Sequence, residues 1–187
     1  MISIKEETAK ATETLRSGKT LLYPTDTVWG LGCDATNAAA IERIFEIKNR
    51  PANKSLIVLV DSIEMLKKYV RGIPETALRA INEATRPTTI IYEESIGLAH
   101  NISADSSVGI RIVNDEFCRE MIHLFGKPIV STSANISGEP TPHTFKEINQ
   151  QIKDSVDYVV GIRQDDEKPA ESSAIIRIKG KKIEIIR

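Results

Sequence analysis

The chain has 187 residues, of which 41% are hydrophobic and 27% charged. These are the proportions of an ordinary globular protein, and they exclude a disordered or fibrous chain. At ~150 residues per domain, the length predicts one domain. The 25 Lys and Arg residues nearly balance the 26 Asp and Glu residues, for a formal net charge of -1. No global field therefore attracts nucleic acid or anionic lipid, and any basic site must be local.

No segment of the sequence resembles a membrane span or a secretory signal. The longest continuous apolar run, from Leu56 to Val60, is far shorter than the ~20 residues that cross a bilayer. The two cysteines, Cys33 and Cys118, are too few for a disulfide framework or a zinc cluster. We therefore expect a cytoplasmic protein with reduced thiols and without a metal site built from its own side chains.

Short β-rich runs alternate with helical patterns, which favours a layered α/β sheet. A helix over 3–17 is predicted to bury Ile4, Ala11 and Leu15 and to stop at Gly18. The spacing then predicts a strand over 20–23, a helix over 37–48 capped by Asn37, and a buried strand over 55–60. Two further helices are predicted after it. The first begins at a capping box formed by Asp61 and Glu64, and the second runs from Pro74 to Ala84.

The second half of the chain continues this alternation. A helix over 114–125 is expected to bury Phe117, Met121 and Leu124 and to end at Gly126. The strands predicted around it cover 88–92, 108–113 and 129–131.

The last part of the chain is predicted to add one helix and a hairpin. Thr144 and Glu147 have the spacing of a helix cap. Two strands over 174–178 and 183–187 then follow, joined through Gly180.

Four polar clusters interrupt these elements near the predicted strand and helix ends. They are YPTDTVWGLG at 23–32, KNRPANK at 48–54, SVGIR at 107–111 and STSANISG at 131–138. Because open α/β sheets bind ligands beyond the ends of their strands, these clusters are the candidate ligand-binding segments. Each also has a purely structural interpretation: a hydroxyl-rich turn, cations that stabilise a helix C-terminus, an edge-strand charge and a Ser-rich surface loop.

The charges and hydroxyl groups in these clusters favour an anionic ligand. Lys48, Arg50 and Lys54 place three cations in seven residues, and a helix dipole does not explain Lys54, which lies beyond the helix and before an apolar strand. Arg111, inside an apolar strand, requires an anionic partner. The small donors at 131–138 can surround a phosphate without steric bulk.

Several common catalytic motifs are absent from the sequence. Neither a Walker-type Gly-x-x-x-x-Gly-Lys-Ser/Thr segment nor a Gly-x-Gly-x-x-Gly turn is present, which excludes the standard P-loop and Rossmann modes of phosphate binding. No Gly-x-Ser-x-Gly motif accompanies His100, His123 or His143, so a Ser-His-Asp hydrolase is poorly supported. His123 lies among apolar residues of a predicted helix and is interpreted as structural.

In their order and spacing, the four clusters resemble the motifs of the threonylcarbamoyl-AMP synthase family, which has the YrdC-like fold. The match covers nearly the whole chain and continues in SAI at 173–175 and IIR at 185–187. The resemblance implies a twisted open mixed sheet flanked by helices, around a large concave basic cavity. It also implies the short form of the family, a single domain over 1–187.

An enzyme of this family condenses L-threonine, bicarbonate and ATP to threonylcarbamoyl-AMP and releases pyrophosphate, and the resemblance implies the same reaction here. The product serves the N6-threonylcarbamoyladenosine modification of tRNA, which implies downstream tRNA threonylcarbamoyl transferase proteins as partners. Double-stranded RNA or tRNA is a further partner that the family implies. Mg²⁺ is expected with the triphosphate of ATP, although the sequence shows no carboxylate cage for it.

The resemblance also assigns residues to the two substrates. The catalytic cations are Lys48, Arg50 and Lys54, of which Arg50 and Lys54 hold the triphosphate while Lys48 neutralises charge beside them. The other nucleotide contacts are Ser107, Ser133, Asn135, Thr141 and Arg187. The contacts to the amino acid are Thr25, Thr27, Arg111, Ser131 and Ser173, with Arg111 suited to pair with the substrate carboxylate.

The sequence departs from the family pattern at several positions, which keeps an alternative open. Ser55 stands where the family has Pro, Arg86 replaces Gly before a Pro, and Ala174 replaces Thr. None of these changes removes a charge that the reaction needs. The alternative is a catalytically silent paralogue that binds double-stranded RNA or tRNA. The related carbamoyl-adenylate chemistry of hydrogenase maturation proteins is disfavoured, because this chain has too few cysteines for their zinc modules.

Overall fold

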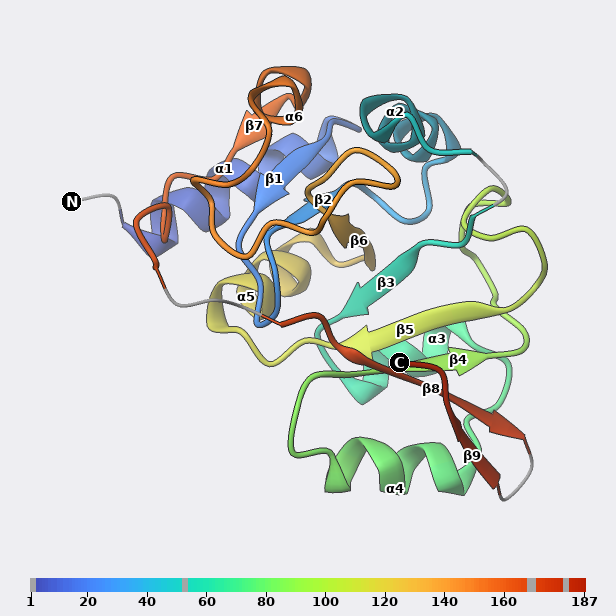
Figure 1. Cartoon of the computed structure of the whole chain (residues 1–187). Helices are drawn as coiled ribbons and strands as arrows, with labels where there is room; N and C mark the ends of the chain where they lie inside the picture. The colour runs from blue at the N-terminus through green and yellow to red at the C-terminus, as the bar shows by residue number, and fades with distance from the viewer. Residues whose placement is uncertain (1–2, 52–53, 168–170, 180–181) are drawn as a thin grey trace.

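The computed structural model describes residues 3–51, 54–167, 171–179 and 182–187. In these residues one nine-stranded sheet, in the order β7-β1-β2-β6-β3-β5-β4-β8-β9, is accompanied by six helices (Figure 1). The helices are α1 (Ile4–Arg16), α2 (Ala38–Lys48), α3 (Ile63–Tyr69), α4 (Glu75–Glu83), α5 (Glu116–Phe125) and α6 (Gln150–Ser155). The strands are β1 (Leu21–Tyr23), β2 (Gly30–Gly32), β3 (Ile57–Val60), β4 (Thr88–Tyr92), β5 (Val108–Ile112), β6 (Ile129–Ser133), β7 (Tyr158–Val159), β8 (Ala174–Lys179) and β9 (Lys182–Ile185).

Parallel and antiparallel pairs are mixed in the sheet. β1 pairs parallel with β7, β3 with β5 and β4 with β8, whereas the other neighbours are antiparallel. β6 connects the two halves, because Ser133 lies opposite Gly30 of β2 and Ser131 lies opposite Ile57 of β3. This arrangement confirms the predicted twisted open mixed sheet flanked by helices (Figure 1). The single-domain organisation over 1–187 stays a prediction.

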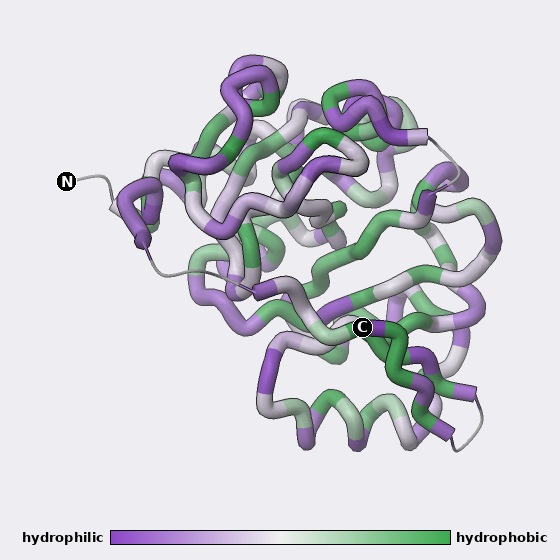
Figure 2. Tube along the Cα trace, viewed as in Figure 1, coloured by the Kyte–Doolittle hydropathy of each residue, from purple (hydrophilic) through white to green (hydrophobic). Residues whose placement is uncertain are grey.

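Helix packing against the sheet builds one hydrophobic core. α1 packs against α5 and β1, and α3 packs against β3 and β5. Ala11 and Leu15 of α1 are buried as predicted, but Ile4, the first residue of the helix, is exposed. Leu124, expected inside, is also exposed at the last turn of α5. Figure 2 shows the apolar stretches of the central strands inside the molecule.

Local signals in the sequence locate several elements correctly. Asn37 caps α2 as predicted, since its Oδ1 accepts the backbone N–H groups of Ala39 and Ala40 at 3.1 and 3.2 Å. The predicted strand over 88–92 has the bounds of β4. α3 is capped by Ser62 rather than Asp61, because the Ser62 hydroxyl accepts the N–H of the third helical residue at 3.2 Å.

The additional helix predicted in this part of the chain is present, but its predicted cap at Thr144 and Glu147 is wrong. The Glu147 carboxylate accepts the backbone N–H of His143 at 2.7 Å, but this bond stabilises a turn. The helix α6 begins later, where the Asn149 side chain accepts the N–H of Gln151 at 2.9 Å.

Two short strands were not predicted from the sequence. β2 is the run Gly-Leu-Gly, a composition that disfavours a strand, and β7 has only two residues. Both pair with β1, so tertiary pairing overrides the local preference. Gly180, the predicted joint of the terminal hairpin, lies outside the described residues.

Gly32 is predicted to be essential for the packing of the β1–β2 hairpin on β6. A Cβ at Gly32 would lie 2.6 Å from both Tyr23 Cε1 and the Val130 carbonyl oxygen. We expect Gly32→Ala to lower the free energy of unfolding by about 3 kcal/mol, measured by urea denaturation.

Gly72→Ala is the control for this variant. Its Cβ would meet no atom within 4 Å, and only the positive φ of +74° opposes it. The expected loss is about 1 kcal/mol. An equal loss for the two variants would show that the close contact at Gly32 has no energetic weight.

Candidate active site

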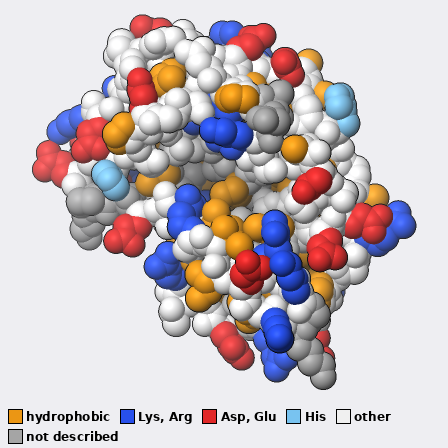
Figure 3. Space-filling view, turned by 45° about the vertical axis from the view of Figure 1, so that its right-hand side comes forward, with side chains coloured by type: hydrophobic (Ala, Val, Ile, Leu, Met, Phe, Trp, Pro, Cys, Tyr) orange, Lys and Arg blue, Asp and Glu red, His pale blue; other side chains and the backbone are white. Residues whose placement is uncertain are grey.

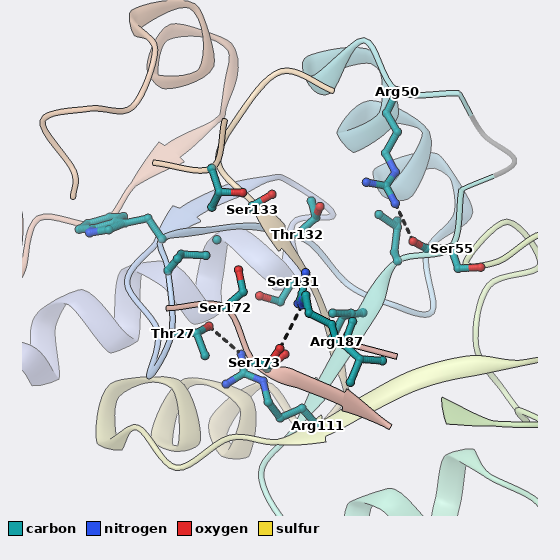
Figure 4. A pocket seen from close by; sticks show the side chains of 17 residues that line it. Thr27, Arg50, Ser55, Arg111, Ser131, Thr132, Ser133, Ser172, Ser173 and Arg187 are labelled. Atoms are coloured by element: carbon teal, nitrogen blue, oxygen red, sulfur yellow. Dashed lines mark hydrogen bonds between the residues drawn. The ribbon is translucent and has the colours of Figure 1, made fainter. Parts of the chain in front are cut away.

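A hollow of about 250 Å³ lies where loops and strand ends from distant parts of the chain meet. It opens on the face shown in Figure 3, with Lys and Arg side chains on its rim. Figure 4 shows hydroxyl groups of β6 on one side and the segment before β8 on the other. Eight of the residues predicted for the site line this hollow: Thr27, Arg50, Arg111, Ser131, Ser133, Thr141, Ser173 and Arg187.

The lining contains three arginines and no Asp or Glu side chain. Arg50 follows α2, after Asn49 ends the helix in the left-handed conformation with φ 48°. Its Nη2 donates to the Ser55 carbonyl at 2.7 Å, while its Nε is buried without a hydrogen-bond partner. Removal from water lowers the pKa of this guanidinium. A buried unpartnered donor beside an open hollow is suited to an anionic ligand.

Arg111 projects from β5 and is held by the loop between β1 and β2. Its Nη1 is paired with the Asp26 carboxylate, and its Nη2 donates to the Thr27 hydroxyl at 3.3 Å (Figure 4). The second Asp26 oxygen accepts the backbone N–H of Asn114 at 3.1 Å. Only 3% of the Arg111 side chain is exposed, and its Nε has no partner. The anionic partner that the sequence requires for Arg111 is therefore Asp26, within this chain.

Arg187 is fixed to the segment before β8. Its Nε donates to the Ser173 carbonyl at 3.2 Å, and the Ser173 hydroxyl lies 2.9 Å from that of Thr89 (Figure 4). Burial lowers the pKa of Arg187, and the nearby Arg86 guanidinium lowers it further. Arg187 thus brings a positive charge from the end of the chain to the same hollow as Arg50.

Thr25 organises the loop that carries Thr27. It is buried, its hydroxyl donates to the Val28 carbonyl at 2.9 Å, and its oxygen accepts the Thr27 N–H at 2.9 Å. Thr25 does not line the hollow. Gly30 keeps the neighbouring wall thin, because a Cβ there would lie 3.0 Å from Ser131 Oγ.

Lys48 lies behind the hollow rather than in its lining. Its side chain is almost fully buried, at 1% exposure. The ammonium group donates to the backbone carbonyls of Ser133 and, at 2.6 Å, Asn135. The Lys48 carbonyl in turn accepts the N–H of Ser137 at 2.8 Å. Lys48 therefore holds the backbone of the segment 131–138, a contact that the spacing of charges in the sequence did not indicate.

Three other predicted residues also lie outside the lining. Lys54 is exposed just before β3. The Ser107 hydroxyl and N–H both donate to Asp105, at 2.6 and 2.9 Å. Asn135 is buried, and its Nδ2 donates to the carbonyls of Ile136 and Glu139, at 3.0 and 2.8 Å, while its Oδ1 has no partner.

Several lining residues were not predicted from the sequence. They include Trp29, Ser55, Thr132 and Ser172. Each is a direct neighbour of a predicted residue or lies within one of the four clusters. This proximity in the sequence is the only feature that could have indicated them as lining residues. The Trp29 ring packs on Phe145, with centroids 4.7 Å apart, which no local pattern indicates.

The described residues provide no ready metal cage. Among them, no group of three or more His, Cys, Asp or Glu side chains could hold a metal ion. A divalent cation at this site would need its ligands from the bound molecule. None of the helices in the same ranges combines the length and hydrophobicity of a membrane span.

The fold and the site together define an α/β protein with a pocket lined by three arginines and several hydroxyl side chains. Residues 13–187 match the family model Sua5/YciO/YrdC, described as "Telomere recombination". The chain belongs to this family.

Named relatives cover most of the chain. The threonylcarbamoyl-AMP synthase of Vibrio campbellii is 34% identical over 144 residues, which are 75% of this chain and 78% of the relative. The putative threonylcarbamoyl-AMP synthase of Methanocaldococcus jannaschii is 34% identical over 188 residues, covering 98% and 87%. The crystal structure of P. abyssi Sua5 complexed with L-threonine is similar with a TM-score of 0.86 at 28% identity. The match covers 100% of this chain and 55% of the Sua5 chain, so this chain spans about half the length of that protein.

Breaking the Asp26–Arg111 pair is expected to destabilise the protein strongly. Asp26→Ala would leave a buried guanidinium without its counter-charge, and such a loss costs about 3 kcal/mol. Urea denaturation measures the change.

The Asp166→Ala variant is the matched control, because Asp166 also pairs with an arginine, Arg163, at 3.1 Å, but is 57% exposed. Its expected loss is under about 1 kcal/mol. If Asp26→Ala costs no more than this control, the buried pair does not fix the loop.

Lys48 is expected to make stability depend on pH. Burial, and to a smaller extent the Arg50 guanidinium, lowers the pKa of Lys48 to about 7. A lysine in the unfolded chain has a pKa of about 10.4. Between these values the unfolded chain binds more protons, so stability rises with pH. Urea denaturation at pH 7, 8 and 9 should show the wild-type protein gaining stability relative to Lys48→Met.

The exposed Lys67 of α3 provides the control. The difference between wild type and Lys67→Met should stay constant over the same pH range. Parallel stability curves for wild type and Lys48→Met would contradict a lowered pKa at Lys48.

Proposed function

We propose that this protein is an L-threonylcarbamoyladenylate synthase. It condenses L-threonine, bicarbonate and ATP to threonylcarbamoyl-AMP and releases pyrophosphate. The observation that carries the proposal is a hollow lined by three arginines and by no Asp or Glu side chain, bordered by small hydroxyl side chains. Its family and the names of its relatives support the same reaction.

The reaction brings anions together, which explains the need for fixed positive charge. The threonine amine attacks the carbon of bicarbonate, and loss of water leaves a carbamate. A carbamate oxygen then attacks the α-phosphorus of ATP, and the bond to the β-phosphate breaks as pyrophosphate leaves. Preorganised guanidinium groups stabilise the charge that develops in this step at little reorganisation cost, and holding both anions in line supplies much of the remaining acceleration.

The amino acid is assigned to the side of the hollow formed by Thr27, Arg111, Ser131 and Ser173. Arg111 lines the hollow and pairs with the substrate carboxylate through the guanidinium donors that Asp26 leaves available. Because Asp26 already balances one positive charge, this side suits a zwitterion better than a polyanion. Thr25 acts here through the loop that it organises.

The nucleotide is assigned to the other side of the hollow. Its proposed contacts in the lining are Arg50, Ser133, Thr141 and Arg187. Lys54, Ser107 and Asn135 stay proposed contacts, although they lie outside the lining. Arg50 and Arg187 have no carboxylate partner among the described ion pairs, so their charges are available for the triphosphate. Lys48, which the sequence suggests as a catalytic cation, is proposed to be a positioning residue that fixes Ser133 and Asn135 through their carbonyls.

ATP is proposed to bind with Mg²⁺ carried on its own phosphates, since no cage of side chains is described for the ion. The product is proposed to pass to tRNA threonylcarbamoyl transferase proteins for N6-threonylcarbamoyladenosine formation. Direct contact with tRNA or double-stranded RNA belongs to the same proposal, as does action in the cytoplasm by one domain over 1–187.

Pyrophosphate release tests the proposed function. Purified protein with ATP and Mg²⁺ should release pyrophosphate only when both L-threonine and bicarbonate are present, and rapidly quenched samples should contain the mixed anhydride by mass spectrometry. Pyrophosphate release at a rate that does not depend on threonine or on bicarbonate would exclude this reaction. Duplex-RNA binding without any ATP binding would support the silent paralogue instead.

Variants at Arg50 and Lys54 test which residues hold the triphosphate. Arg50→Ala should lower kcat/KM for ATP by about 10²-fold or more, and Lys54→Ala should lower pyrophosphate release in the same assay. Arg43→Ala is the matched control, because Arg43 lies on α2 but pairs with Glu46 at the surface. If Arg50→Ala behaves like Arg43→Ala, Arg50 does not bind ATP.

A further inference from the structure

The free edge of the sheet at β9 is unusually apolar. Six large hydrophobic side chains are exposed in the described residues, and three of them, Ile183, Ile185 and Ile186, lie in or next to this strand. Figure 2 shows the same hydrophobic stretch beside the C-terminus. Among the described strands, β9 is the last of the sheet and pairs only with β8. Exposed apolar edge strands readily pair with another strand.

The hydrogen-bond pattern shows which β9 residues face the free edge. Ile175 of β8 donates to the Arg187 carbonyl at 3.0 Å and accepts the Ile186 N–H at 2.8 Å. Bonding alternates along an antiparallel ladder, and Arg177 and Lys179 lie opposite Glu184 and Lys182. Lys182 and Glu184 therefore bond to β8.

By the same alternation, Ile183 and Ile185 direct their N–H and C=O groups away from the sheet. Opposite them on β8 lie Ile178 and Ile176, which are buried. The outer edge of β9 thus offers backbone donors and acceptors at two isoleucines whose side chains are 52% and 77% exposed.

The order of charges in β9 makes the strand complementary to itself. If two antiparallel copies pair with Ile183 opposite Ile183, Lys182 of each copy lies opposite Glu184 of the other. These are non-hydrogen-bonded positions, at which opposite side chains come closest. Centring the pair on Glu184 would instead place two glutamates opposite each other. Glu184 is also paired with Lys179 of its own chain at 3.2 Å, so each glutamate would lie between two lysines in the register centred on Ile183. Of these two registers, charge favours the one centred on Ile183.

We propose that β9 pairs antiparallel with β9 of a second copy of this chain, across a two-fold axis at Ile183. The sheet continues through the axis, and each interface contains two Lys182–Glu184 pairs. The contact is isologous, so it closes as a dimer and does not propagate. Because β9 has only four residues, the dimer is expected to be weak and dependent on concentration. The proposal is independent of the reaction assigned to the hollow.

Charge reversal tests the register directly. Lys182→Glu places two pairs of glutamates across the axis, and Glu184→Lys places two pairs of lysines there. Each variant alone should dimerise at least about tenfold more weakly than wild type in sedimentation equilibrium. An equimolar mixture of the two variants restores opposite charges at both positions, and it should form a heterodimer with an affinity near that of wild type.

A cysteine at the axis provides a second measurement. In Ile183→Cys the two Cα atoms would lie about 5.5 Å apart, within the range of a disulfide. Mild oxidation should therefore yield a covalent dimer, whereas the natural cysteines, Cys33 and Cys118, are buried. Ile4→Cys is the control, because Ile4 is similarly exposed, at 48%, but lies on α1.

Three results would overturn the proposal. The first is a wild-type protein that stays monomeric to millimolar concentration. The second is a failure of the two charge variants to recover affinity on mixing, although each is folded by circular dichroism. The third is oxidation of Ile183→Cys that yields no more dimer than oxidation of Ile4→Cys. Weakened single variants, recovery on mixing and selective crosslinking at Ile183 together support it.

Discussion

The buried pair between Arg111 and Asp26 is the interaction on which the geometry of the site depends. It ties β5, in one half of the sheet, to the loop between β1 and β2 in the other. Removing both charged groups from water is costly, and the second Asp26 bond, to the Asn114 N–H, offsets part of this cost. The loop that carries Thr27 therefore has one position relative to β5, and the hydroxyl groups face the hollow in a fixed arrangement.

The two sides of the hollow differ in whether their arginines have a counter-ion within the chain. Arg111 has its counter-ion within the chain, whereas Arg50 and Arg187 donate to backbone carbonyls, which carry no formal charge. Lys48 lies behind the lining of the hollow, where its ammonium group donates to the carbonyls of Ser133 and Asn135. The positive charge left for a ligand is thus concentrated near Arg50 and Arg187, where the polyanionic end of a nucleotide is assigned.

Site residues could be predicted from the sequence where a motif marks them, but not where tertiary packing determines which way a side chain points. The apolar strand around Arg111 indicated a functional arginine, and the family resemblance implied Thr27 and Ser131; all three line the hollow. Lys48 and Arg50 look alike in sequence, two residues apart, yet one turns inward and the other borders the hollow, because the left-handed Asn49 between them reverses the chain. Among the elements, Asn37 and α2 follow from local capping, whereas β2 exists only through its neighbours.

The strand order also governs when the hollow can exist during synthesis. β8 inserts beside β4, some 80 residues earlier in the chain, and Arg187 follows it by way of β9. Contacts between residues so distant form late in folding, because closing long loops is entropically costly. A nascent chain that has emerged only as far as β6 contains the hydroxyl wall and Arg50 but lacks Ser173 and Arg187, so the lining of the hollow is still incomplete at that stage.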